Sequence, residues 1–142
     1  LYVRSIGPTS TIERTWIASN SVEARNAIGG GMMIDTATAA TQISNSTING
    51  NTVTSTRLAT DVAKGYGRAG GLFIGGDSVI ANSTISDNTV PGGLGGGIFH
   101  WGTQTAARAG SKVYNSTISS NSLASASAGA CAVHRAQPLC AD

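Results

Sequence analysis

Residues 80–90 read Ile-Ala-Asn-Ser-Thr-Ile-Ser-Asp-Asn-Thr-Val, and this eleven-residue pattern occurs four times in the chain. The other copies begin at Ile12, Ile43 and Val113, and all four align without gaps. Repeats of a short unit are typical of architectures in which each unit stacks on the next one. The pattern therefore predicts a repeat protein in which each copy contributes one layer.

The aligned copies contain three apolar columns, one at each end of the pattern and one in its middle. Polar and apolar residues alternate around them with the period of two that is characteristic of β-strands, and no segment sustains the helical period of 3.6. Each copy is followed, at variable distance, by a glycine-led apolar triplet such as Gly70-Gly71-Leu72-Phe73-Ile74. The columns are Ile12, Ile43, Ile80 and Val113; Ile17, Ile48, Ile85 and Ile118; and Val22, Val53, Val90 and Leu123.

These features predict an all-β fold, a right-handed parallel β-helix (β-solenoid) of about four coils with loop insertions. We expect a single β-helix domain, 1–142, in which each coil carries three short strand-like segments. The coils are expected near residues 10–34, 41–74, 78–100 and 111–134, with a C-terminal cap at 131–142. The variable spacing between copies places the insertions in loops.

The composition excludes several classes of protein. Charged residues make up 11% of the chain, which is too few for a disordered solvating tail or for the outer faces of a helical bundle. A net charge of +2 is too small and too scattered for a nucleic-acid footprint. No window approaches the roughly 18 uninterrupted apolar residues of a membrane span, so we expect no transmembrane segment. The chain begins at Leu1 without a leader, which we interpret as a processed product or a piece of a longer protein.

Asparagine occupies two further columns of the repeat. We predict that the column Asn20, Asn51, Asn88 and Asn121 forms a ladder at a corner of the coil, where buried amides bond one another and satisfy corner backbone groups. Asparagine also tolerates the left-handed conformation that a tight corner needs. The second column, Asn45, Asn82 and Asn115, is expected at the preceding corner, with Arg14 in its place in the first copy. These three residues also begin N-glycosylation sequons, but the corner interpretation is favoured because the motif is tied to the repeat.

The motifs resemble those of a known family. The Gly-Gly-apolar-apolar and apolar-x-x-Asn motifs are similar to the Gly-Gly-Ala-Ile and Phe-x-x-Asn repeats of bacterial polymorphic outer-membrane proteins and related surface β-helix proteins. The first matches Gly70-Gly71-Leu72-Phe73 and Gly96-Gly97-Ile98-Phe99, and the second matches the segments that end at the four ladder asparagines. The resemblance covers about residues 10–134, although Ile stands where that family favours Phe and the translocator barrel is missing. It implies the right-handed parallel β-helix and a surface location, and it implies no active site.

The two cysteines, Cys131 and Cys140, have a spacing that suits a small closed loop. We predict a disulfide, which would imply an oxidising, extracytoplasmic location: secreted, cell-surface or periplasmic. Two free thiols remain an alternative. A metal site that includes His134 is a further one, although this set of residues matches no common zinc pattern.

The acidic residues show no pattern of a carbohydrate-active site. Polysaccharide lyases and hydrolases need clustered carboxylates, and in the repeat no two acids stack on neighbouring coils. The Gly-x-Gly-x-x-Gly match at residues 65–70 lacks the strand and helix that flank a nucleotide-binding loop. We therefore expect no catalytic, cofactor-binding or metal-binding residues. The acids are Glu13, Glu23, Asp35, Asp61, Asp77, Asp87 and Asp142.

Recognition is expected in the loops. Tyr66 and Arg68 lie in the longest insertion, and Trp101 and Arg108 lie in or beside the loop after the third triplet. The aromatic rings of Tyr66 and Trp101 could stack on a sugar or anchor a protein partner, although a ring packed over its own coil is the alternative.

The expected function is a non-catalytic extracellular or cell-surface scaffold, or adhesion-type module, that is a fragment or a subunit of a larger assembly. A short stack has open ends, and nothing like a cap precedes Ile12, so a protein partner or further coils are expected at the N-terminal end. Carbohydrate is a further candidate partner, and nucleic acid is not. Two alternatives are a fragment of a polysaccharide-active β-helix enzyme and an ice- or surface-binding solenoid. The second would display the outward row Trp16, Thr47, Thr84 and Thr117.

Overall fold

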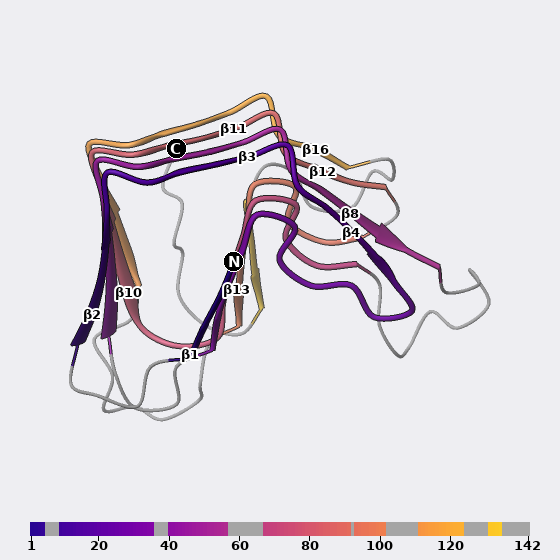
Figure 1. Ribbon diagram of the computed structural model, residues 1–142, viewed down its shortest axis with the longest axis horizontal. Helices are drawn as coiled ribbons and strands as arrows, with labels where there is room; N and C mark the ends of the chain where they lie inside the picture. The colour runs from indigo at the N-terminus through magenta and orange to yellow at the C-terminus, as the bar shows by residue number, and fades with distance from the viewer. Residues whose placement is uncertain are drawn as a thin grey trace.

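The computed structural model describes residues 1–4, 9–35, 40–56, 67–91, 93–101 and 111–123, and the backbone of 131–134. Within these residues every regular element is a β-strand, and the strands pair in parallel within four sheets. The chain visits the sheets in the same order in each coil (Figure 1). The predicted all-β parallel β-helix of about four coils is confirmed.

We name the sheets A to D, and the strands of each are given in the order in which they pair. Sheet A contains β1 (Tyr2–Arg4), β5 (Met32–Asp35), β9 (Leu72–Ile74), β13 (Ile98–Trp101) and β17 (Cys131–His134). Sheet B contains β14 (Lys112–Tyr114), β10 (Ser78–Ala81), β6 (Ala40–Ser44) and β2 (Thr9–Glu13). Sheet C contains β15 (Thr117–Ser119), β11 (Thr84–Ser86), β7 (Thr47–Asn49) and β3 (Trp16–Ala18). Sheet D contains β16 (Ser122–Leu123), β12 (Thr89–Val90), β8 (Thr52–Ser55) and β4 (Ser21–Ala24).

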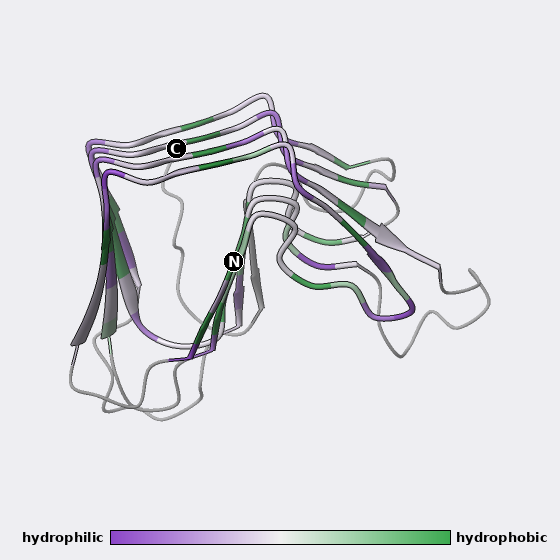
Figure 2. Ribbon diagram, viewed as in Figure 1, coloured by the Kyte–Doolittle hydropathy of each residue, from purple (hydrophilic) through white to green (hydrophobic). Residues whose placement is uncertain are grey.

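Equivalent residues of the repeat lie directly above one another. Ile48 pairs with Ile17 on one side and with Ile85 on the other, and Ile43 likewise pairs with Ile12 and Ile80. Figure 2 shows the result, because hydrophobic segments recur at the same place in successive coils. The apolar columns of the sequence are therefore the stacked layers of the core.

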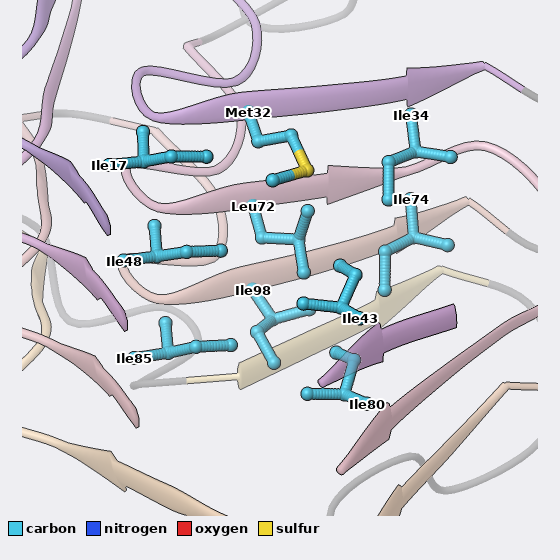
Figure 3. Close-up of a cluster of buried hydrophobic side chains, with 10 residues drawn as sticks. All are labelled: Ile17, Met32, Ile34, Ile43, Ile48, Leu72, Ile74, Ile80, Ile85 and Ile98. Atoms are coloured by element: carbon cyan, nitrogen blue, oxygen red, sulfur yellow. The ribbon is translucent and has the colours of Figure 1, made fainter. Parts of the chain in front are cut away.

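Sheets A, B and C enclose the main core (Figure 3). Strand alternation turns Leu72 and Ile74 of the second triplet inward, whereas Phe73 between them points to the outer face of sheet A. Removing such aliphatic side chains from water is the main stabilising contribution to a column of this kind. The cluster consists of Ile17, Met32, Ile34, Ile43, Ile48, Leu72, Ile74, Ile80, Ile85 and Ile98.

Sheet D runs away from the column and forms a side arm with its own core (Figure 1). Val53 and Val90 pack there against Ala27 rather than against the main core. The returning chain is joined from coil to coil by parallel bridges from Ile28 to Arg68 and from Arg68 to Leu94. Each of the first three coils therefore contains four strands and a return segment. The expectation of three strand-like segments was wrong, because corners at the two asparagine columns divide each eleven-residue pattern into strands of sheets B, C and D, and the apolar triplet adds a strand of sheet A.

Glycine is required where the arm joins the column. A Cβ atom on Gly70 would lie 2.5 Å from the carbonyl oxygen of Gly96 and 2.7 Å from the amide nitrogen of Thr89. Gly30 in the coil above has the same surroundings, 2.5 Å from the oxygen of Gly70. Outgoing and returning strands thus pass backbone against backbone, and we call this contact the neck. It explains why each of the first three apolar triplets is preceded by glycines.

The two ends of the stack differ from the expectation. Strand β1 pairs with β5 and extends sheet A by one level, so the idea that nothing covers the coil before Ile12 was wrong for this sheet. Residues 131–134, expected both to end the fourth coil and to begin a cap, form β17, which pairs with β13 and belongs to the fourth coil. The remainder of that cap, 135–142, lies outside the described residues. No helix that could cross a membrane is present in the described part of the chain.

The neck predicts that Gly70→Ala is strongly destabilising. The added methyl group would press on backbone atoms that cannot move independently, and overpacking of this kind costs about 1–3 kcal/mol or more. Chemical denaturation followed by circular dichroism measures the loss of unfolding free energy.

Gly50→Asp is the matched control. Gly50 has a positive φ of 63°, but the nearest atom to an added Cβ is 3.8 Å away, and Asp87 adopts the same conformation at this corner one coil below. It should cost less than about 1 kcal/mol. Equal losses in the two variants would contradict the role assigned to the neck.

Candidate functional site

The asparagines of the first polar column form a continuous ladder. The backbone amide and the side-chain Nδ2 of Asn51 both donate to Oδ1 of Asn88 at 2.9 Å, and the same pair of bonds joins Asn20 to Asn51 and Asn88 to Asn121. Asn51 also donates to the carbonyl oxygen of Ile17, so its polar atoms are satisfied while the side chain is fully buried. These residues hold the corner between sheets C and D. In the two inner coils their polar atoms are used for this purpose.

The left-handed residue at this corner is not the asparagine, as the sequence suggested, but the residue before it. Positive φ values occur at Ser19, Gly50, Asp87 and Ser120. At the preceding corner, between sheets B and C, the asparagines do adopt this conformation: φ is 51° at Asn45, 49° at Asn82 and 44° at Asn115, and it is 50° at Arg14. Asparagine pays little for positive φ among non-glycine residues, which accounts for the second column. The asparagine side chains are exposed, whereas Ser46 and Ser83 beside them are buried, and N-glycosylation stays a hypothesis.

A second ladder, of hydroxyl groups, was not foreseen. The backbone amide of Ser46 donates to Oγ of Ser83 at 3.1 Å, and Thr15 and Ser83 make the equivalent bonds to the coil below. Each serine in turn donates to the carbonyl two residues earlier in its own coil, as Ser46 does to Ser44 at 2.7 Å. The signal was present in the sequence, because serine follows asparagine in three copies, but the sequon concealed it.

A buried imidazole interrupts the main core. His100 is the register partner of Ile74, and its Nε2 lies 3.1 Å from the carbonyl oxygen of Gly76 and 3.0 Å from Oγ of Ser111. The ring is 8% exposed and is enclosed by the coil. The contact joins coil 3 to coil 4 and is structural. Nearby, the hydroxyls of Thr41 and Ser78 are buried and have no hydrogen-bond partner among the described residues.

Two predicted sites fall outside the described residues. Cys140 is not described, and of Cys131 and His134 only the backbone is described, so the disulfide remains a prediction. Tyr66 and Arg108 are likewise not described. Among the described residues, no three side chains of the histidine, cysteine, aspartate or glutamate type are grouped closely enough to hold a metal ion.

The structure brings together Arg68 and Trp101, the other two predicted recognition residues. The guanidinium carbon of Arg68 lies 4.8 Å from the centre of the Trp101 ring and 5.7 Å from that of Phe99. Phe99 stacks on Phe73 of the coil above, with 5.7 Å between the ring centres. Trp101 is neither fully tucked away nor free, because it packs on Phe99 yet keeps 38% of its surface exposed. The aromatic cluster lies on the outer face of sheet A, against the return segment of the arm.

Burial lowers the pKa of Arg68 below its ordinary value, because the half-buried guanidinium has lost part of its hydration. Stacking on aromatic rings offsets part of this cost through cation–π attraction. The guanidinium remains charged at neutral pH, since the ordinary value is far above 7. The arrangement can therefore present a fixed positive charge beside an indole ring.

Comparison with protein-family models, with curated proteins and with solved structures gave no match. The arguments for function consequently rest on the residues of this chain.

We predict that Asn51→Ala lowers the unfolding free energy by at least about 2 kcal/mol, because it leaves the backbone amide of Asn20 and the carbonyl oxygen of Ile17 without their partner and removes one of the two bonds to Oδ1 of Asn88. Asn45→Gly is the comparison: it removes an exposed asparagine, and glycine adopts the positive φ of this corner readily. Urea unfolding of the two variants measures the difference. A cost at Asn45 as large as that at Asn51 would refute the distinction between the two columns.

Proposed function

We propose that the protein is a non-catalytic β-helix scaffold with an adhesion-type role, located outside the cytoplasm at a cell surface, and that it belongs to a larger assembly. The observation that carries the proposal is the N-terminal end of the stack. Strands β2, β3 and β4 have a partner on one side only among the described residues. Trp16, on the middle strand, is 77% exposed. Open strand edges beside an exposed aromatic ring are features of a surface that receives a partner.

The end is stepped. Sheet A is one strand taller than the other three sheets, so a partner that supplies three strands would fill the step. The asparagine ladder also supports a partner at this end. Oδ1 of Asn51 and of Asn88 each accept two hydrogen bonds from the coil above, whereas within the described residues the side chain of Asn20 acts only as a donor. Further coils or a protein partner with parallel strands would continue both features.

The proposal that the protein is not an enzyme is supported by the use of its polar residues. Asparagine and serine, which recur in every coil, bond the coils to one another. The resemblance to polymorphic outer-membrane repeats supports the surface location, since those repeats build surface β-helices.

One observation favours the surface-binding alternative. Thr47, Thr84 and Thr117 stand in register on the outer face of sheet C. The neighbouring row is already engaged, because Nδ2 of Asn49 donates to Oγ of Ser86 at 3.1 Å and to the carboxylate of Asp87 at 2.9 Å. Trp16 ends the threonine row at the first coil. An ice-binding face needs a regular array, so this function ranks second.

The open end predicts a pattern of amide hydrogen exchange. In the isolated chain, residues 9–24 should exchange faster than residues 78–90, because the edge strands have unpaired amides while the third coil is bonded on both sides. Mass spectrometry of peptic fragments measures both regions. Slow exchange in residues 9–24 of a chain that sediments as a monomer would contradict the proposed partner surface.

A bead assay tests adhesion and the absence of catalysis together. Beads that carry the chain should remain under flow on surfaces coated with polysaccharide or with extracellular-matrix protein, compared with beads that carry an unrelated monomeric protein. No reducing sugar should be released from the coat. Release of sugar would support the enzyme alternative, and retention on no surface would overturn the adhesion-type role.

A further inference from the structure

Arg68 departs from the repeat at a position where the repeat is otherwise apolar. Parallel bridges align Arg68 with Ile28 of the coil above and with Leu94 of the coil below. Both neighbours pack against the aromatic cluster on the outer face of sheet A. An arginine at this point adds the cost of desolvating a charge and contributes no aliphatic core. Residues that break the local rule of a fold are expected at functional sites.

The guanidinium has aromatic support but no anionic partner among the described residues. Phe99 and Trp101 of coil 3 hold it by cation–π contacts. The ion pair found in the described part of the chain joins Arg14 to Glu13, at 3.3 Å and at a different corner. A planar group of five N–H donors, fixed in place by stacking, is suited to bind a carboxylate with two parallel hydrogen bonds. Because the group is already ordered, binding would cost little conformational entropy.

The surface next to Trp101 has polarity suited to a sugar. Since Ile74 pairs with His100, the following residue, Gly75, lies beside Trp101 and places no side chain there. Asp35 follows in the next strand on the same outer face, with an exposed carboxylate that accepts a hydrogen bond from the Tyr2 hydroxyl at 3.4 Å. Two strand spacings, about 9–10 Å, separate it from Trp101. Among the described residues it makes no ion pair with Arg68. An indole, one cation and one hydrogen-bond acceptor around a glycine match a ligand with an apolar face, a carboxylate and hydroxyl groups.

We propose that Arg68 and Trp101, together with the surface at Gly75, form a binding site for a uronic acid unit of an acidic polysaccharide. The guanidinium binds the sugar carboxylate, the indole packs against the pyranose ring, and Asp35 accepts hydrogen bonds from sugar hydroxyls. The inference rests on the proposed adhesion-type function and names its ligand class. A carboxylate of an acidic peptide could bind the guanidinium, but the peptide would make no use of the surface at Gly75 or of Asp35.

Isothermal titration calorimetry of the full chain tests the site with three probes: an oligogalacturonate, a neutral glucose oligomer and polyglutamate. We expect binding of the oligogalacturonate, weakened by added salt, and at least tenfold weaker binding of the other two. Equal affinity for polyglutamate would identify a simple anion site and overturn the sugar assignment. Equal affinity for the glucose oligomer would overturn the role of the carboxylate.

Arg68→Leu separates binding from folding, because leucine is the residue that the repeat itself uses one coil below. The variant should melt at the same or a higher temperature and lose oligogalacturonate affinity by about tenfold or more, as expected when a charge-assisted hydrogen bond is removed. Arg68→Lys should show an intermediate loss of affinity, since lysine keeps the positive charge but not the two parallel N–H donors of the guanidinium. Arg14→Gln is the control, because the Arg14 side chain is 80% exposed and already pairs with Glu13. Unchanged affinity in Arg68→Leu, or an equal loss in Arg14→Gln, would refute the site.

The two proposals fail separately. Beads carrying Arg68→Leu that adhere as well as the wild type would refute the uronate site as the adhesive element and leave adhesion standing. Oligogalacturonate binding that depends on Arg68, together with beads that adhere to no surface, would refute adhesion and leave the site standing.

Discussion

Each coil must place the same kind of polar group at the same corner as the coil below it, and the rest of the structure depends on this constraint. Where the chain bends between sheets C and D, backbone amides lose their place in a strand ladder, and an unpaired buried amide is costly. The side chain of Asn51 solves the problem for its own coil and for its neighbours, because it accepts two bonds from Asn20 and donates to Asn88. The stacking of the apolar columns, and that of the hydroxyl ladder at the other corner, keeps the same register.

In so regular a structure, the residues to which we assign a function are exceptions to the repeat. Ile28 and Leu94 serve the packing of the arm, and Arg68 between them does not. Trp16 stands at the head of a row of threonines, at an edge where the stack could continue. Neither exception improves the core. One lies where the arm returns to sheet A, and the other lies at the open end, so the proposed ligand and the proposed partner use separate parts of the molecule.

The sequence predicted the features that depend on one position recurring at each coil: the isoleucine layers and the asparagine ladder. It could not predict the side arm, because Val53 and Val90 read the same whether they face the main core or a separate one. Strand β1 was missed because three residues are too few to show a repeat. Arg68 and Trp101 were each singled out, but not their contact, since it depends on the path by which the arm returns and on a ring from the following coil.

The neck divides the molecule into a part that is held constant and a part that is free to vary. Main-chain hydrogen bonds from Gly31 to Gly70 and from Gly71 to Gly96 join the return segments of successive coils at the neck. Gly70 packs there against the backbone of Thr89 in the outgoing strand, independently of what lies further out. The longest insertion in the sequence falls between β8 and Arg68, which both belong to the arm of coil 2. Changes in length there need not disturb the column. Evolution can therefore lengthen or rewrite the arm and the aromatic site beside it, while the stacked coils keep their register.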